Sequence, residues 1–211
     1  MNLTHIDKLD AIEMSDGFVW RPVRKHFGIR AFGTNVYTPG ASRRVVEEHT
    51  EGTYQHEEIY LVLRGRVLFT VDGNDHELGQ RQLVFLRDPS IKRGAIALTD
   101  DAAVLAVGGK PGEPHEISAW EYTFAASPAL RAGRYDEARA LLHEGLEAKP
   151  GHPSILYDLA CVEALAGQSE SAFELLDEAI AKDERFRAYA QKDTDFASIK
   201  DDPRFPAAES P

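Results

Sequence analysis

The sequence predicts a two-domain protein in which an all-β half precedes an all-α half. Short apolar runs broken by turn residues continue to residue 108, and a helical repeat begins after residue 117. Between them, "GGKPGEPHE" at 108–116 holds three glycines and two prolines, which end a strand and prevent a helix from starting. We therefore expect one domain at 1–116 and a second at 117–211.

The N-terminal half is predicted to form antiparallel strands. Its runs are rich in Val, Phe, Tyr and Leu and are separated by Gly, Pro, Asn and Asp, a pattern typical of sandwiches and barrels. "DGND" at 72–75 supplies the residues of a hairpin turn. No helical period competes in this half. The expected strands are "FVWRPVR", "RAFGTNVY", "RRVVEEH", "EEIYLVLRG", "VLFTVDG", "QLVFLRD", "AIAL" and "AVLAVGG".

The C-terminal half repeats itself at an interval of 34 residues. The recurring pairs are Gly133 and Gly167, Ala138 and Ala172, Leu142 and Leu176, and Gly145 and Ala179. Each copy indicates a helix, a Gly turn and a second helix, with small residues where the helices approach closely and a Leu in the seam between them. The pattern resembles the tetratricopeptide repeat over residues 120–184. That resemblance implies a helical array whose groove holds a protein or peptide.

The segment after the second copy is expected to cap the array. Two repeats leave an apolar face open, and "FRAYAQKDTDFASIKDDPRF" is predicted to form one or two short helices over it. The apolar side chains available for this purpose are Phe186, Tyr189, Phe196, Ile199 and Phe205. Cys161 is the single cysteine, so it forms no intramolecular disulfide, and we expect it to be a small buried helix residue.

The stretch "HTEGTYQHEEIYLVLRG" at 49–65 gathers histidines and glutamates in front of an apolar strand. If "GTYQ" at 52–55 is a four-residue hairpin loop, strand register pairs residues that lie opposite each other. The pairs are Glu51 with His56, His49 with Glu58, Glu47 with Tyr60 and Val45 with Val62. Alternation then places all of them on one side of the sheet, where imidazoles and carboxylates could converge on one ion or one ligand.

The same stretch resembles the first motif of the cupins, in which a Glu, here Glu58, is followed by six residues and a Gly, here Gly65. The resemblance continues through "GRVLFTVDG" and "LGQRQLVFLRDPSIKRGAI" and covers roughly residues 18–108. It implies a double-sheet jelly-roll barrel with an interior ligand site. Many cupins hold a divalent metal there, through two His and one Glu of the first motif and one His of the second.

The sequence departs from this motif at the metal positions. His49-x-Glu51 replaces the usual His-x-His, and Lys92 stands where the second-motif His is expected. Two interpretations of the pocket remain open. In one, the resemblance implies Fe, Mn, Ni or Zn held by His49 and Glu58 with either His56 or Glu51. In the other, His–Glu and Lys–Glu pairs satisfy one another, or Lys92 holds an anionic ligand, in a barrel that binds a small molecule or nothing.

Charge and composition narrow the classes of partner. The formal charge is −11, with 14 basic and 17 acidic residues up to Glu116 and 10 basic and 18 acidic residues after it. This acidity disfavours nucleic acid as a partner, since nucleic-acid affinity rests on Lys and Arg. No long apolar run, Gly-rich phosphate loop or nucleophile elbow is present. We expect a cytoplasmic protein without a membrane or nucleic-acid partner.

Three functions follow as alternatives. The first is a barrel that binds or senses a small ligand, joined to a helical module for protein interaction. The second is a metal-dependent enzyme of the dioxygenase or isomerase type, in which His49, His56 and Glu58 hold the ion and Glu47 or Tyr60 handles protons. The third is an assembly protein that forms a homodimer through the barrel.

Overall fold

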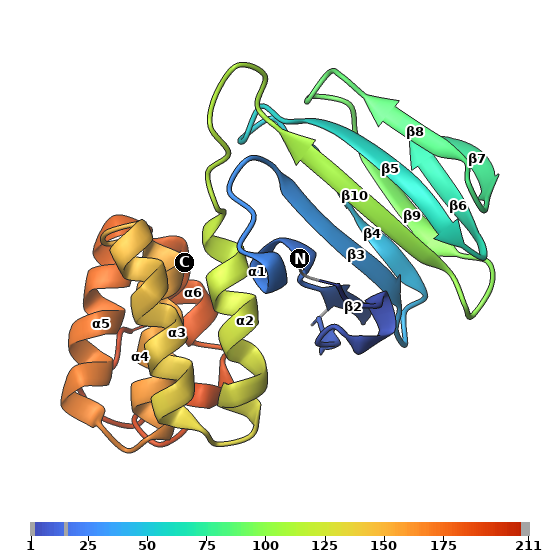
Figure 1. Ribbon diagram of the computed structural model, residues 1–211. Coiled ribbons are helices and arrows are strands. Elements are labelled where there is room, and N and C mark those ends of the chain that lie inside the picture. Colours follow the sequence, from blue (N-terminus) through green and yellow to red (C-terminus); the bar gives the residue numbers. More distant parts are fainter. Residues whose placement is uncertain (1–2, 15–16, 208–211) are drawn as a thin grey trace. The chain divides into compact units, whose positions relative to one another are not determined.

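The computed structural model describes residues 3–14 and 17–207. The chain divides into two compact units, Met1–Ile117 and Ser118–Pro211 (Figure 1). Each unit has its own cluster of buried apolar side chains. Among the described residues, no helix combines the length and the apolar character that crossing a bilayer requires.

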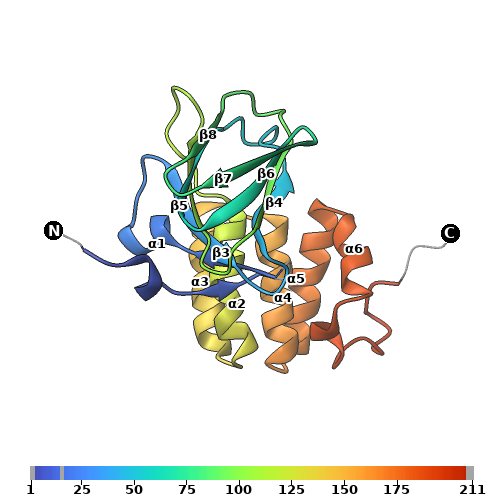
Figure 2. The same cartoon turned by 90° about the vertical axis from the view of Figure 1, so that its right-hand side faces the viewer.

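The first unit is built from two antiparallel sheets that share one apolar interior (Figure 2). In spatial order, the six-stranded sheet holds β1 (Ile12–Glu13), β2 (Phe18–Arg21), β3 (Gly33–Pro39), β10 (Ala103–Gly109), β5 (Glu57–Arg64) and β8 (Leu83–Leu86). The four-stranded sheet holds β4 (Arg44–His49), β9 (Arg93–Ala97), β6 (Arg66–Val71) and β7 (Asn74–Gly79). The predicted double-sheet domain is confirmed. Within the described residues, no strand of one sheet pairs with a strand of the other. The two sheets pack as a sandwich.

Each of the eight predicted runs contains a strand, and the expected hairpin is present. Val71 pairs with Asn74 across a two-residue loop in which Asp72 and Gly73 have φ values of 46° and 79°. Positive φ at both loop positions is the geometry of a type I′ turn, which matches the right-handed twist of the flanking strands. The Asp-Gly pair therefore forms the turn that its residues favour.

Four short elements of this unit lie outside the prediction. The helix α1 (Val23–Phe27) corrects the expectation that no helix competes in this half. It begins after Pro22, which lacks a backbone N–H, and ends at Gly28 with φ 63°. The strand β7 escaped prediction because it is a mostly exposed, polar edge strand without apolar alternation. The other two are the 3-10 turn η1 (Ile6–Lys8) and the two-residue strand β1.

The register predicted for residues 49–65 is wrong. β4 pairs with β9, whereas β5 pairs with β10 and β8, so β4 and β5 belong to different sheets. The segment 50–56 crosses from one sheet to the other, and the two strands contribute to the same interior from opposite sides. Alternation places the same residues inward in a hairpin and in such an arch, which explains why the residue pattern could not distinguish them.

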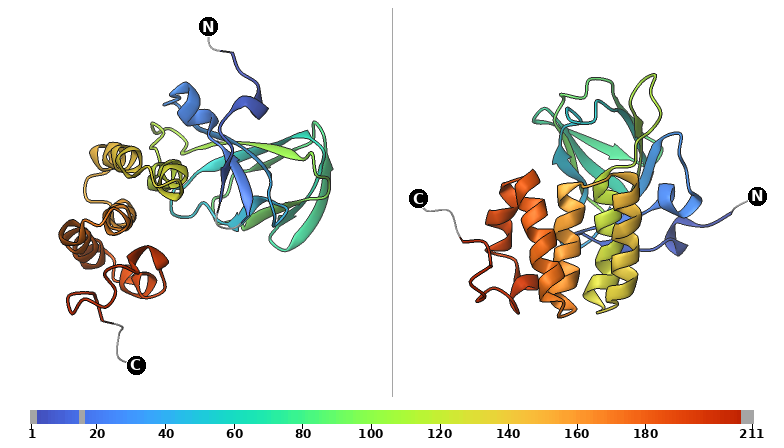
Figure 3. Two further views of the ribbon diagram at one scale, coloured as in Figure 1. Left: turned by 90° about the horizontal axis from the view of Figure 1, so that it is seen from below. Right: turned by 90° about the vertical axis from the view of Figure 1, so that its left-hand side faces the viewer.

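The second unit contains the predicted helix pairs. These are α2 (Ala119–Arg131) with α3 (Tyr135–Ala148), and α4 (Pro153–Leu165) with α5 (Ser169–Lys182), followed by α6 (Arg185–Ala190) and the 3-10 turn η2 (Thr194–Phe196). Figure 3 shows α2 to α5 side by side as antiparallel neighbours. Gly133 and Gly167 have φ values of 69° and 78° just after α2 and α4. Left-handed glycines thus end the first helix of each pair, as the repeat predicts.

The recurring small and Leu positions form the seams between helices. Ala138, Leu142, Ala172 and Leu176 are all buried. A Cβ at Gly145 would lie 2.9 Å from both Cβ and Cγ of Tyr122, so the backbone of α3 approaches α2 too closely for a side chain. The predicted role of these positions is confirmed, and Cys161 is buried in α4 as expected.

The C-terminal segment covers the open end of the array through four of the five predicted side chains. Phe186, Phe196, Ile199 and Phe205 join the apolar core of α4 and α5. Tyr189 was predicted to join them but is 54% exposed. On the six-residue helix α6, Phe186 and Ala190 face the core at a spacing of four residues, which directs Tyr189 toward solvent.

Candidate functional site

Six ionisable side chains meet at one end of the β-domain interior, where β4 ends and where β5 and β9 begin. We call this group the polar cluster. Its members are His49 on β4, Glu51 and His56 in the connecting segment, Glu58 and Tyr60 on β5, and Arg93 on β9.

Backbone structure holds each part of the polar cluster in place. His49 and Arg93 are direct partners in the pairing of β4 with β9. The Glu51 N–H donates to the Pro89 carbonyl at 2.8 Å, which anchors the crossing segment to the loop before β9. On the opposite sheet, Gly108 pairs with Glu58, and a Cβ at Gly108 would lie 2.9 Å from Glu58 Cγ. Because Gly108 has no side chain, Glu58 Cγ can occupy this space.

Both ring nitrogens of His49 face oxygen acceptors. Nδ1 lies 2.7 Å from the Glu47 carbonyl oxygen, and Nε2 lies 3.3 Å from Glu51 Oε1 and 3.9 Å from Glu58 Oε2. Burial lowers the pKa of His49, but the hydrogen bonds to Glu51 and to the Glu47 carbonyl and the charges of both carboxylates raise it above its ordinary value overall. The surrounding acceptors therefore favour protonation of His49 more than water does.

Glu51 lies between two histidines. Its Oε2 is 3.2 Å from His56 Nδ1, while Oε1 faces His49. Burial raises the pKa of Glu51, but the hydrogen bonds from His49 and His56 outweigh it and bring the value to about 2. Glu51 is thus a buried carboxylate that stays ionised throughout the physiological pH range.

Glu58 has different partners. The Tyr60 hydroxyl donates to Glu58 Oε2 at 2.5 Å, and Arg93 Nε lies 3.5 Å from the same oxygen. Burial, followed by the charge of Glu51, raises the pKa of Glu58 against the opposing effects of Tyr60, His49 and Arg93. Burial, then the charge of Glu58, raises the pKa of Tyr60 far above its usual range, so Tyr60 acts as a hydrogen-bond donor.

Arg93 is the member that the sequence prediction missed, because it assigned the cationic position to Lys92. The structure places Lys92 outside the polar cluster, 57% exposed and paired with Glu48 at 2.5 Å. Arg93 instead points inward on β9, where Ala95 and Ala97 are also buried. Arg93, Ala95 and Ala97 are spaced by two residues, so strand alternation puts them on one face, and this spacing was the signal for the one-residue shift.

Glu47 was also predicted to join the site, but its side chain is exposed, and its carbonyl oxygen lies 2.7 Å from His49 Nδ1. The pairing of β4 with β9 shifts register twice, between Arg44 and Val46 and between Val46 and His49. Such bulges disturb strict alternation, so counting by twos from His49 gives the wrong face for Glu47.

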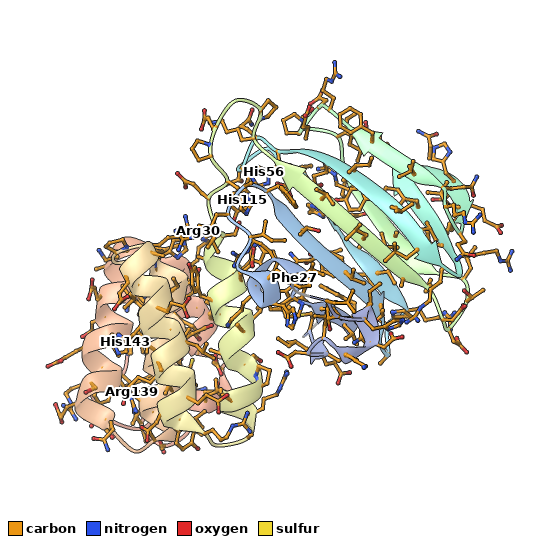
Figure 4. All side chains as sticks on the ribbon, in the orientation of Figure 1. Phe27, Arg30, His56, His115, Arg139 and His143 are labelled. Atoms are coloured by element: carbon orange, nitrogen blue, oxygen red, sulfur yellow. The ribbon has the colours of Figure 1, made fainter. Side chains whose placement is uncertain are left out.

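Two aromatic rings border His56. Tyr54 stacks on it with ring centroids 5.6 Å apart, and the His115 ring lies 5.9 Å from it on another side. Figure 4 shows His56 and His115 close together at this end of the β-domain. A Cβ at Gly33 would lie 2.9 Å from His115 Cε1, so a glycine on β3 makes space for that ring. The linker position of His115 in the sequence did not indicate this proximity.

The donor atoms of the polar cluster fit a metal ion in number and spacing, but not in charge. Ligating atoms of His49, Glu51 and Glu58 all lie within 4.8 Å of one another. However, Glu58 Oε2 already accepts a hydrogen bond from Tyr60 and faces the buried guanidinium of Arg93. A resident divalent cation would share this carboxylate with an existing buried cation, so the residues as arranged do not fit one.

Comparisons with known proteins agree with the two halves of the fold. Residues 129–192 match the family model described as tetratricopeptide repeat. No curated protein matches the chain.

Solved structures similar to the N-terminal half include three cupins or cupin-like proteins. A cupin protein from Bacteroides fragilis is 23% identical, with 53% of this chain and 89% of that chain covered and a TM-score of 0.37. A putative sugar phosphate isomerase from Acidithiobacillus ferrooxidans is 15% identical, with 54% and 77% covered and a TM-score of 0.46. A Cupin 2 conserved barrel domain protein from Salinispora arenicola is 16% identical, with 53% and 90% covered and a TM-score of 0.40. The chain is similar to cupin structures over about half of its length, and residues 129–192 match the tetratricopeptide repeat.

Proposed function

We propose that the protein binds a small polar molecule at the polar cluster of its β-domain and binds a protein or peptide through its helical repeats. The observation that carries the first part is the partly buried His49–Glu51–His56 chain, in which an ionised carboxylate lies between two imidazoles at hydrogen-bonding distance. Such groups lose solvation when they are buried, and stability alone gives little reason to retain them.

The chemistry of the polar cluster suits a ligand with several hydrogen-bonding groups. Carboxylate oxygens accept, imidazole N–H groups donate, and Tyr54 and His115 supply aromatic surface beside His56. Buried ionisable groups with perturbed pKa values are also more frequent at binding sites than elsewhere. A small polar molecule would exchange hydrogen bonds with these groups without needing a metal ion.

A ligand screen by thermal shift tests this function. The full chain is heated with a panel of sugars, sugar phosphates, amino acids and carboxylic acids, and hits are titrated by calorimetry. We expect a hit to stabilise the wild type and to lose most of this effect in Glu51→Gln. Glu48→Gln is the matched control, because Glu48 points outward from the same β-domain toward Lys92. Equal stabilisation of the wild type and Glu51→Gln by every hit would contradict the proposal.

The helical half supports the second part through its family match and its charge. The residues after Glu116 carry 18 acidic and 10 basic side chains, which favours a basic partner segment. Selection from a peptide library with the full chain is expected to enrich Lys- and Arg-rich peptides, whose binding weakens as salt concentration rises. Enrichment of acidic peptides, or binding that is indifferent to salt, would count against a basic partner.

A metal-dependent enzyme is the second candidate. The convergence of His49, Glu51 and Glu58 within 4.8 Å favours it, although Arg93 opposes it. Elemental analysis of protein purified without chelator, beside Glu58→Gln, distinguishes the candidates. About one equivalent of Fe, Mn, Ni or Zn in the wild type, lost in the variant, would favour the enzyme.

A further inference from the structure

The guanidinium of Arg93 is a buried positive charge that, within the described part of the chain, forms one ion pair. Its side chain is 0% exposed, and Nε lies 3.5 Å from Glu58 Oε2. Among the described residues, none of its three nitrogens makes a hydrogen bond. Because an uncompensated charge is costly in the protein interior, Glu58 is the group on which this guanidinium depends.

A divalent cation bound by the polar cluster would compete for the same carboxylate. His49 Nε2 and Glu58 Oε2 are 3.9 Å apart, so an ion between them would touch the oxygen that faces Arg93. Two cations at such short range repel each other strongly in an environment of low dielectric constant. The ion would also draw Glu58 away from Arg93 and leave the buried guanidinium without its counter-ion.

We propose that Arg93 is the resident cation of the polar cluster and that it prevents divalent metal ions from binding tightly to His49, Glu51 and Glu58. These three donors are otherwise spaced closely enough for one ion. The positive charge of Arg93 is therefore what separates this site from a metal centre. The inference concerns the same cluster as the proposed ligand binding, but its test needs no small molecule.

Calorimetric titration of the full chain with ZnCl₂ and MnCl₂ tests the proposal in four proteins. Arg93→Met removes the charge and keeps a long side chain, whereas Arg93→Lys keeps the charge. Arg66→Met is the matched control, because it removes the same charge from an exposed Arg paired with Glu77. We expect Arg93→Met to bind about one equivalent at least about tenfold more tightly than the wild type, Arg93→Lys or Arg66→Met.

A further substitution identifies the site of the gained binding. Adding Glu58→Gln to Arg93→Met should remove the gain, since the third donor is then lost. Circular dichroism and a thermal melt verify that each variant is folded, and Arg93→Gln serves as the neutral variant if Arg93→Met is not. Tight binding of one equivalent by the wild type, or no gain in the folded neutral variant, would overturn the proposal. A ligand screen without hits would refute the proposed small-molecule function but leave the metal titration valid.

Discussion

At the scale of single residues, Gly108 and Asp158 show how neighbouring atoms control a carboxyl group. Gly108 leaves the space that Glu58 Cγ occupies. In the helical unit, Asp158 lies near Asp193 and Asp195, and Asp193 is already engaged by the Tyr157 hydroxyl at 2.9 Å and by the Asp195 N–H at 3.0 Å. A missing side chain makes space for the Glu58 carboxyl group, whereas burial and the neighbouring like charges raise the pKa of Asp158.

Gly108→Ala is expected to destabilise the β-domain by about 1–3 kcal/mol, because its Cβ would meet Glu58 Cγ at 2.9 Å and the Glu57 carbonyl oxygen at 3.3 Å. Urea unfolding followed by Trp20 fluorescence measures the effect in a Trp120→Phe background. Gly109→Ala is the matched control, since no atom lies within 4 Å of its Cβ. Equal stabilities of the two variants would show that Glu58 has room to move.

The raised pKa of Asp158 predicts that the stability of the helical domain depends on pH. Burial, then the charges of Asp193 and Asp195, raises its pKa from 3.8 to about 7. The folded state therefore binds more protons than the unfolded state between these values, and stability falls as pH rises through this window. The thermal midpoint at 222 nm should decrease from pH 5 to pH 8.

Asp158→Asn should make this decrease shallower, because the amide does not titrate. The remaining slope would combine Asp195, whose pKa burial and Asp193 also raise, with His152, whose pKa burial lowers and whose contribution has the opposite sign. Cys161 and Tyr157, which face the same carboxyl groups, have raised pKa values and stay protonated in this range. Identical slopes for the wild type and Asp158→Asn would contradict the assignment.

At the scale of elements, contacts between helices fix the array. α3 meets α2 at Gly145 and Tyr122, and α3 meets α4 through Arg139 and Glu163. Arg139 Nε donates to Glu163 Oε1 at 2.6 Å and Nη2 donates to Oε2 at 3.0 Å, a bidentate pair. Figure 4 labels Arg139 on α3. The contact between α3 and α2 depends on the absence of a side chain at Gly145. The contact between α3 and α4 depends on the charged side chains of Arg139 and Glu163.

Gly145→Ala is expected to lower stability despite the higher helix propensity of Ala. The propensity gain is about 1 kcal/mol, whereas overpacking against Tyr122 at 2.9 Å costs about 1–3 kcal/mol. Urea unfolding at 222 nm measures the difference. In a Tyr122→Ala background the contact with the ring disappears, whereas the Cβ atom at position 122 and Ile155 Cδ1 remain 2.9 Å and 3.0 Å from the new Cβ, so the same substitution should lose part of its cost. A destabilisation that persists there in full would point to another cause.

A double-mutant cycle of Arg139→Met and Glu163→Gln should give a coupling free energy of roughly 0.5–3 kcal/mol. The Arg139 and Glu163 side chains are only 28% and 9% exposed, so water screens the pair weakly. The pair of Arg134 with Glu137 is the control, because both of its side chains are more than half exposed. A coupling no larger than that of the control pair would mean that burial adds nothing.

At the scale of the whole molecule, the chain consists of two units with separate apolar cores. Each contains one of the two tryptophans, Trp20 on β2 and Trp120 on α2. This distribution makes each unit individually observable by fluorescence once the other tryptophan is replaced.

The two units are expected to unfold in separate transitions, because cooperativity depends on shared packing. Trp20 fluorescence in Trp120→Phe reports the β-domain, and circular dichroism at 222 nm reports mainly the helices. We expect urea midpoints that differ between the two probes. Coincident midpoints and slopes in both probes would show instead that the chain unfolds as one cooperative unit.

The sequence by itself determined the elements whose signals are local. The Asp72-Gly73 turn, the left-handed glycines at 133 and 167, and the buried seam at Leu142 and Leu176 all follow from residue type and spacing. These features depend on backbone preferences and on a helical period that neighbouring residues express without distant partners. A six-residue helix has too few turns to show a clear helical period. The side of α6 on which Tyr189 lies was therefore predicted wrongly.

Only the tertiary structure decided which strands pair and whether Lys92 or Arg93 points into the interior of the β-domain. Alternation identifies two faces of a strand, but it does not name the neighbouring strand, so the hairpin expected at 49–65 proved to be an arch between sheets. The bulges in β4 and the inward setting of β9 removed Glu47 and Lys92 from the site and brought Arg93 to Glu58. A shift of one residue reverses a strand's faces, and long-range pairing sets that register.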